Sequence, residues 1–229
     1  MNSSDPRENL RQVLDRIAAA CDRAGRSRDE VSLVAVSKTF PPERVRQVLD
    51  CGQLLFGENR VQEALAKIPE VGGGARWHMI GHLQRNKARH AIGLFELIHS
   101  VDGLKLAQEL DRRSESGGMV QPILVEVNLA QESSKSGVEE AGLWPLLEGI
   151  QPLTHLELRG LMTVPPHVPQ AEEARPWFIR LRGLAEEARR RTGLPLPELS
   201  MGMTDDFEVA VEEGATLVRV GRAIFGPRD

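Results

Sequence analysis

The sequence predicts one domain of the α/β class, a (β/α)8 barrel of the TIM type with an extra helix before its first strand. Eight short runs rich in apolar and β-branched residues alternate with amphipathic stretches along the 229 residues. This gives about 29 residues per unit, close to the spacing of a barrel of about 250 residues. No linker rich in glycine, serine or charge divides the chain, so residues 1–229 are expected to form a single domain. An open doubly wound sheet is the alternative fold.

The first elements carry clear start and stop signals. Residues 6–25 have an apolar stripe at helical spacing and end in glycine, which predicts the extra helix. The continuous apolar run VSLVAVS at 31–37 is typical of a strand buried on both faces of a parallel sheet. The segment 41–52 begins with proline and ends with glycine, as helices commonly do.

The same alternation continues to the end of the chain. Further strands are expected at residues 54–57, 76–81, 94–101, 120–129, 155–164, 196–202 and 216–226. Further helices are expected at residues 58–68, 83–92, 103–114, 139–150, 170–192 and 205–215. Active sites of such barrels lie at the C-terminal ends of the strands, so the residues that follow each strand are the first candidates for function.

The composition narrows the classes of function and location. The formal net charge is −4 and basic residues are interspersed with acidic ones, which argues against nucleic-acid binding. The short basic run RNKARH at 85–90 is either a helix surface or a local site for phosphate or another polyanion. Cys21 and Cys51 lack metal-ligand spacing, the first residues are polar, and no run reaches the roughly 18 apolar residues of a membrane span. A cytoplasmic protein without membrane contact is expected.

Lys38 is the most informative residue, because it ends a buried apolar strand. A desolvated lysine loses its proton more readily and can then attack a carbonyl to form a Schiff base. The alternative is a lysine that extends to solvent or pairs with an acid such as Glu58.

Two segments near the end of the chain have the features of a phosphate site. SMGMTDD places Ser200, Gly202 and Thr204 directly before a helix, and RVGRAIFG places Gly221 at the last strand with an arginine on either side. Exposed backbone N–H groups and the positive end of a helix favour an anion, and the loops after strands seven and eight are the recurrent phosphate site of this fold. Alternatively, Ser200 and Thr204 only cap the helix and Gly221 only turns the chain.

A Schiff-base lysine beside a phosphate site matches pyridoxal 5′-phosphate. Arg219 lies two residues before Gly221, so both residues face the same side of the strand. A permanent cation there would keep the pyridine nitrogen unprotonated, which suits binding or racemase-type chemistry better than transamination. The alternative is that Arg219 pairs with an acid such as Glu126 inside the barrel.

These residues stand in segments that resemble the pyridoxal phosphate homeostasis protein family, which is similar to the barrel domain of alanine racemase. The segments that match, in order over residues 31–226, are VAVSKTFP, FGENRVQE, WHMIGHLQRNK, HSVDG, SSKSG, LRGLMTV, LSMGMTDDFEVAVEEGAT and VRVGRAIFG. The resemblance implies that Lys38 holds the cofactor as an aldimine and that Arg219 faces the ring nitrogen. The other implied cofactor-binding residues are Asn59 near the ring, Ser200, Gly202, Thr204 and Gly221 at the phosphate, and His82 and Met162 along the pocket. Arg222 stands where many members carry a small hydroxyl residue, so no phosphate contact is implied for it.

The resemblance implies a carrier and not an enzyme. Members of the family are credited with binding pyridoxal phosphate and with buffering or delivering it for vitamin B6 homeostasis, and no catalysis is established for them. Pyridoxal phosphate and the apoenzymes that depend on it are therefore the expected partners.

Two enzyme classes are alternatives to the carrier, an amino-acid racemase and a Schiff-base aldolase. Alanine racemase opposes its lysine with a tyrosine from a second domain. This sequence contains no tyrosine, so a racemase would need another second base, for which His82 is the candidate. We expect a monomer, because the second domain that forms the racemase dimer is missing. The loop SSKSG at 133–137 is either an ordinary surface loop or a partner contact.

Overall fold

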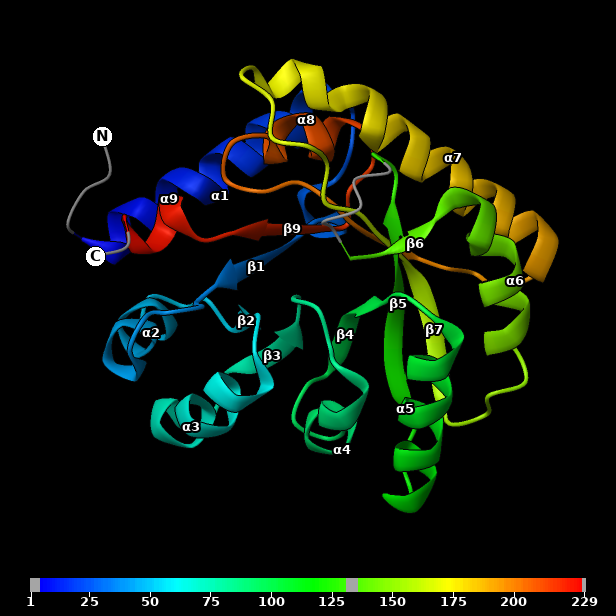
Figure 1. Cartoon of the computed structure of the whole chain (residues 1–229). Coiled ribbons are helices and arrows are strands. Elements are labelled where there is room, and N and C mark those ends of the chain that lie inside the picture. Colours follow the sequence, from blue (N-terminus) through cyan, green and yellow to red (C-terminus); the bar gives the residue numbers. More distant parts are fainter. Residues whose placement is uncertain (1–4, 131–135, 228–229) are drawn as a thin grey trace.

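The computed structural model describes residues 5–130 and 136–227, and these form a closed parallel barrel with helices around it (Figure 1). The barrel strands of the described chain are β1 (Ser32–Val36), β2 (Leu55–Glu58), β3 (Arg76–Met79), β4 (Leu97–Val101), β5 (Gln121–Asn128), β7 (Leu156–Met162), β8 (Glu198–Ser200) and β9 (Leu217–Val220). They pair in this order, and the pairing of β9 with β1 closes the ring. The predicted (β/α)8 barrel is confirmed, and the open sheet is excluded. A short strand that was not expected, β6 (Val138–Glu139), pairs with β5.

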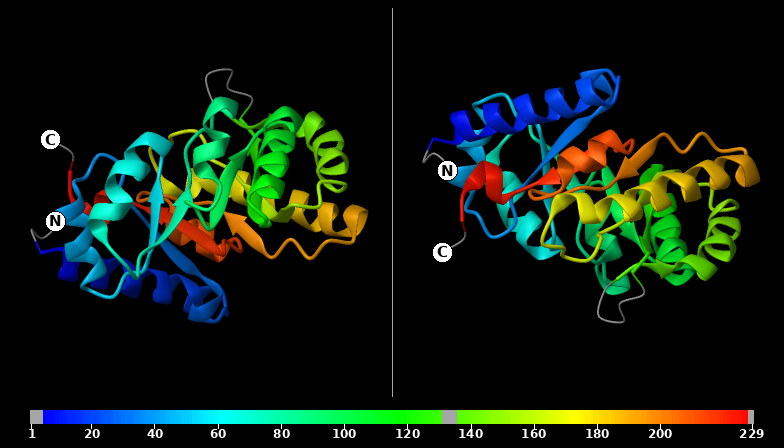
Figure 2. Two further views of the ribbon diagram at one scale, coloured as in Figure 1. Left: turned by 90° about the horizontal axis from the view of Figure 1, so that it is seen from below. Right: turned by 90° about the horizontal axis from the view of Figure 1, so that it is seen from above.

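The helices lie outside the ring of strands, as both views of Figure 2 show. Their bounds are α1 (Pro6–Arg23), α2 (Pro42–Leu49), α3 (Val61–Val71), α4 (Ala88–Ala91), α5 (Leu104–Ser116), α6 (Glu140–Ile150), α7 (Arg175–Thr192), α8 (Phe207–Glu212) and α9 (Arg222–Phe225). Short 3₁₀ turns cover Arg28–Glu30, Arg85–Lys87 and Ala171–Ala174. The extra helix α1 packs beside α9, where the Asn9 side chain donates to the carbonyl of Ile224 at 3.1 Å.

Two expected elements differ from the structure. The helix expected over 83–92 is a 3₁₀ turn followed by the single turn of α4, and the chain reverses at Gly93 with φ of 74°. The strand expected over 216–226 ends at Val220, because the backbone of Gly221 leaves the extended conformation and α9 starts at once. The last barrel strand is therefore short, and its polar end lies at the rim of the barrel.

The core has two parts, separated by the sheet. The larger part packs the helices onto the outside of the barrel, and a small apolar cluster fills the inside. Alternate residues of a barrel strand point inward, so each step of two residues rises by one layer. The interior positions run from the apolar layer to the strand ends as Val34, Val36 and Lys38 on β1 and its end, Leu124, Glu126 and Asn128 on β5, and Leu217, Arg219 and Gly221 on β9 and its end. The interior thus changes from apolar to polar toward the C-terminal ends of the strands.

The described residues contain no helix long and apolar enough to cross a membrane. Within the same residues, no group of three or more His, Cys, Asp or Glu side chains could hold a metal ion.

Candidate functional site

A cavity of about 410 Å³ opens at the C-terminal ends of the barrel strands. Six of the predicted site residues line this cavity, namely Lys38, Asn59, His82, Thr204, Arg219 and Gly221. Arg222 lines it as well, together with acidic and amide side chains that include Glu126 and Asn128. Residues from β1, β2, β3, β5, β8 and β9, or from the segments after them, thus meet at one place.

Lys38 is presented to the cavity by a tight turn directly after β1. The next residue, Thr39, has φ of 70°, a left-handed conformation that costs a non-glycine residue roughly 1–2 kcal/mol. The N–H of Thr39 donates to Oε1 of Glu63 at 2.5 Å, and the N–H of Phe40 donates to the carbonyl of Ser37 at 3.1 Å. These hydrogen bonds hold the turn in place and so fix where the backbone of Lys38 lies.

Behind this turn lies a buried ion pair that sequence reasoning missed. The Lys67 amine, on α3, donates to Oε1 of Glu58 at 2.6 Å, to Oε1 of Glu63 at 2.8 Å and to the carbonyl of Ser37 at 2.8 Å. The Ser37 hydroxyl also donates to Oε1 of Glu58, at 2.7 Å. Burial raises the pKa of Glu58, while the hydrogen bond from Lys67 opposes that rise. The lysine that pairs with Glu58 is therefore Lys67, and Oε2 of Glu58 accepts no hydrogen bond from the described residues.

The Arg219 guanidinium is fixed inside the barrel. Its Nη1 donates to Oγ of Ser200 at 2.6 Å and its Nη2 donates to the carbonyl of Thr163 at 2.9 Å, and the residue is 4% exposed. Burial lowers the pKa of Arg219 to about 10, so the group stays charged at neutral pH. Glu126 interacts with Arg219 through charge, but no hydrogen bond joins the two side chains in the described part of the chain. Burial raises the pKa of Glu126 to about 7, against the opposing effect of Arg219.

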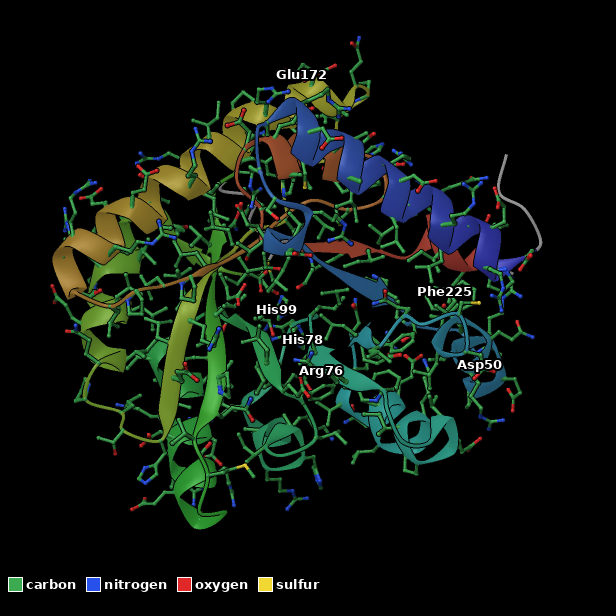
Figure 3. All side chains as sticks on the ribbon, turned by 180° about the vertical axis from the view of Figure 1, so that it is seen from behind. Asp50, Arg76, His78, His99, Glu172 and Phe225 are labelled. Atoms are coloured by element: carbon green, nitrogen blue, oxygen red, sulfur yellow. The ribbon has the colours of Figure 1, made fainter. Side chains whose placement is uncertain are left out.

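A hydrogen-bonded chain continues from Arg219 across the barrel. Ser200 Oγ lies 2.8 Å from Nδ1 of His99. Nε2 of His99 lies 2.9 Å from Nδ1 of His78, and Figure 3 labels these two histidines next to each other. Burial lowers the pKa of both imidazoles, to about 3 for His78, so both rings are neutral at pH 7. A guanidinium only donates, so the Ser200 oxygen accepts from Arg219. The Ser200 hydroxyl can then donate to Nδ1 of His99, and Nε2–H of His99 can donate to Nδ1 of His78, which gives each of these atoms a partner. The chain fixes the orientation of the Arg219 charge beneath the cavity.

The two segments expected to bind phosphate lie beside each other at the rim. Gly202 has φ of 89°, and a Cβ there would lie 2.5 Å from Cβ of Ala210, so only glycine fits this turn. After the turn, the backbone N–H groups of Thr204 and Asp205 have no acceptor among the described residues. Arg222 donates to both carboxylate oxygens of Asp205, at 2.6 and 2.7 Å, and so links the loop after β8 to α9.

The remaining predicted residues lie behind the cavity and do not line it. Ser200 is buried and bound to Arg219, Gly202 forms the turn, and Met162 is 1% exposed in the apolar layer inside the barrel. Their contacts with a cofactor remain predictions. His82 is at the open side of the cavity, with 50% of its side chain exposed and its Nδ1 3.2 Å from Oδ2 of Asp102. Most of the loop predicted at 133–137 lies outside the described residues.

Glu126 is the lining residue that the sequence signalled most clearly without being assigned to the site. It is a lone charge in the apolar run at 120–129, in the same interior register as Leu124 and Asn128. This alternation along the strand could have assigned Glu126 to the cavity from the sequence alone. No comparable signal marked Lys67, because its position on α3 reads as an ordinary helical residue.

Known proteins are similar to this chain in sequence and in fold. The family model of the alanine racemase N-terminal domain matches residues 9–229. Pyridoxal phosphate homeostasis proteins of Aquifex aeolicus and Escherichia coli K12 are 46% and 41% identical, over 96% and 99% of this chain and 97% and 98% of theirs. The structure of PipY from Synechococcus elongatus with pyridoxal phosphate bound has a TM-score of 0.84 and 39% identity, over 93% of this chain and all of that chain (100%). An alanine racemase of Clostridium difficile shares the fold alone, with a TM-score of 0.73 and 15% identity over 96% of this chain and 57% of that one.

Proposed function

This chain belongs to the pyridoxal phosphate homeostasis protein family, and from this premise we propose that it binds pyridoxal 5′-phosphate and buffers or delivers it without a reaction of its own. The observation that carries the proposal is that one cavity brings together the Lys38 amine, the buried Arg219 guanidinium and the loops at Thr204 and Gly221. The relative with pyridoxal phosphate bound, 39% identical, supports the same ligand. In this proposal residues 1–229 act as one cofactor-binding domain.

The lining residues fit a ligand that carries an aldehyde, a pyridine ring and a phosphate. The aldehyde supplies a carbonyl carbon that an amine can attack, and Lys38 is the one lysine that lines the cavity in the described part of the chain. The open N–H groups of Thr204 and Asp205 suit phosphate oxygens. A Cβ at Gly221 would lie 3.1 Å from the carbonyl oxygen of Val36, so glycine allows the ends of β9 and β1 to lie close together at the rim of the cavity. The volume of about 410 Å³ is within the usual range of small-molecule sites, about 300–1,000 Å³.

Arg219 is suited to hold the ring nitrogen of the ligand without a proton. Two hydrogen bonds fix its guanidinium, and its pKa of about 10 keeps it charged at neutral pH. A fixed positive charge disfavours a second positive charge beside it. The ring would then withdraw electrons less strongly, which fits storage of the cofactor better than turnover of an amino acid.

The racemase alternative has one specific observation in its favour. His82 lines the cavity and its Nδ1 lies 3.2 Å from a carboxylate oxygen of Asp102, an arrangement in which a histidine can work as a base. Its half-exposed side chain is open to water, whereas stabilisation of a carbanion benefits from the exclusion of water. We therefore favour the carrier.

Absorbance and mass spectrometry test the attachment to Lys38. The purified protein mixed with pyridoxal phosphate is expected to turn yellow, and borohydride reduction should leave one added mass on the peptide that contains Lys38. Lys38→Ala should lose both signals, while Lys105→Ala, at an exposed lysine on α5, should keep both. A colourless wild-type protein, or an adduct that persists in Lys38→Ala, contradicts the proposed site.

Two assays separate carrier from racemase. Incubation of the loaded protein with single L-amino acids, followed by chiral chromatography, should yield no D-enantiomer above the background of free pyridoxal phosphate. An apoenzyme added to the loaded protein should gain activity faster than spontaneous cofactor release allows. Robust D-amino-acid formation that is lost in His82→Gln would establish the racemase instead.

A further inference from the structure

A second hollow of about 350 Å³ adjoins the first cavity. It lies between the start of α3 and the 3₁₀ turn before α4, and Asn59 and His82 line both spaces. Its lining residues come from two segments and from Met79, and apart from Asn59 and His82 they do not line the first cavity: Asn59, Arg60, Val61 and Gln62, and His82, Leu83, Gln84 and Lys87. The hollow is called the Arg60 hollow here, after the arginine at its edge.

The charge of the Arg60 hollow is positive and uncompensated. Arg60 and Lys87 both line it, and neither side chain has a hydrogen-bond or ion-pair partner among residues 5–130 and 136–227. None of its lining residues is acidic. Many other arginines of this acidic chain do pair with carboxylates, for example Arg76 with Glu96 at 2.8 Å.

Two acids beside lining residues of the hollow, Glu63 after Gln62 and Asp102 next to His82, are already engaged. Glu63 accepts hydrogen bonds from Lys67 and from the backbone of Thr39, and Asp102 pairs with His82. Neither carboxylate is therefore available to neutralise Arg60 or Lys87. An anion from solution would supply the negative charge that the described protein residues do not provide.

The walls of the hollow are already in place without a ligand. A Cβ on Gly81 would lie 2.5 Å from the carbonyl oxygen of Asn59, so the ends of β2 and β3 meet in close backbone contact. The buried side chains of Met79 and Leu83 also line the hollow. Arg60 is the N-cap residue of α3 and makes no side-chain cap, so the N–H groups of the first turn remain open beside it. An anion that enters meets cations and donors that need little rearrangement.

We propose that the Arg60 hollow binds the phosphate group of a small molecule, as a site separate from that of the cofactor phosphate. A guanidinium and an ammonium together carry two positive charges, which match the charge of nearly −2 on a phosphate monoester at pH 7 better than the single charge of a carboxylate. Arg60 can offer two parallel N–H donors, while Lys87 acts as a point charge, and the amides of Gln62 and Gln84 can donate to further oxygens. The basic run at 85–90 thus contributes Lys87 to an anion site, whereas Arg85 and Arg89 of that run do not line it. This proposal does not depend on what the first cavity binds.

Crystals and calorimetry test the proposal on the full chain loaded with pyridoxal phosphate. Inorganic phosphate is titrated by calorimetry, and crystals are soaked with tungstate, whose heavy atom locates a phosphate site directly. We expect tungstate between Arg60 and Lys87, and phosphate affinity that falls about tenfold in Arg60→Gln and in Lys87→Gln. Arg85→Gln removes the same charge from a neighbouring position outside the hollow and should change the affinity less than about twofold. Arg60→Gln and Lys87→Gln lie on different elements, so a folding defect in one variant leaves the other informative.

Three further ligands identify the source of the phosphate. Glycerol phosphate binding tighter than inorganic phosphate would indicate a phosphorylated metabolite, and equal binding would indicate free phosphate, both within the proposal. Acetate binding as tightly as phosphate would show a carboxylate site and overturn it. Absence of phosphate binding below about 10 mM, tungstate at another place, or affinity unchanged in Arg60→Gln and Lys87→Gln would also overturn it. If the protein takes up no pyridoxal phosphate, the tungstate position in the apoprotein still decides this question separately from the proposed function.

Discussion

Replacement of Lys67 by methionine removes the buried amine that joins the ends of β1 and β2 to α3. Lys67 is 4% exposed and donates three hydrogen bonds of 2.6–2.8 Å, and Glu58, its main partner, is fully buried. The variant must either bury the Glu58 carboxylate without its cation or protonate it. Removal of one member of a buried pair typically costs about 3–5 kcal/mol.

The variant can avoid an unpaired buried charge by protonating Glu58. The free energy of this protonation is then the smaller of the two losses, and it depends on pH. A carboxyl with the ordinary pKa of 4.5 costs about 1.4 kcal/mol per pH unit to protonate, which is about 3 kcal/mol at pH 7 and about 1 kcal/mol at pH 5.5. The folded variant then binds a proton that the unfolded chain releases, so its stability falls as the pH rises above the pKa of the unfolded chain. We expect Lys67→Met to lose about 3 kcal/mol of unfolding free energy at pH 7 and about 1 kcal/mol at pH 5.5.

Urea unfolding at the two pH values measures the effect. The double variant Glu58→Gln/Lys67→Met removes the titrating carboxyl and should lose most of the pH dependence, and Lys105→Met at an exposed position should change stability by less than about 0.5 kcal/mol. Equal losses at both pH values, or a double variant with the same pH dependence as Lys67→Met, would refute this account of the pair.

Three other variants test the turn, the buried chain and the charge of the cavity. Gly202→Ala should destabilise the protein by at least about 2 kcal/mol, because its Cβ would lie 2.5 Å from Cβ of Ala210, whereas Gly183→Ala on α7 meets no atom within 4 Å and should raise the melting temperature slightly. Ser200→Ala leaves buried donors and acceptors without their partner and should lower the unfolding free energy by about 1–3 kcal/mol in urea titrations, while Ser200→Thr retains the hydroxyl and should lose less. Glu126 has a pKa of about 7, so it becomes a carboxylate as the pH rises from 6 to 8. Its negative charge repels the phosphate group and should weaken the binding of pyridoxal phosphate in that interval. Calorimetry on Glu126→Gln should show affinity without that decline, and a decline equal to that of the wild type would contradict the role of Glu126.

Much of the barrel and of the site could be predicted from the sequence because both depend on local patterns. The apolar runs define the strands, and their C-terminal ends all point to the same rim, so Lys38, Arg219 and Gly221 could be assigned to one site without knowledge of strand pairing. Errors occurred where one glycine changed the path of the chain. Gly221 ends β9 earlier than its apolar continuation suggested, since the run IF that follows is helical.

The sequence by itself determined the class of the fold, the rim at which the site lies and the lysine at its centre, because strand periodicity and strand ends are local properties. Only the tertiary structure decided which side chains meet. Lys67 reaches back from α3 to Glu58 at the end of β2, and Ser200 joins Arg219 on the neighbouring strand to His99, which is distant in the sequence. The packing of α3 against the end of β2 sets the first contact, and closure of the barrel with its strand register sets the contacts of Ser200. The periodicity of a single strand predicts none of them. A buried polar side chain pairs with the group that the folded barrel places within hydrogen-bond distance. The free energy lost by leaving it unpaired is larger than the free energy of its local conformational preferences.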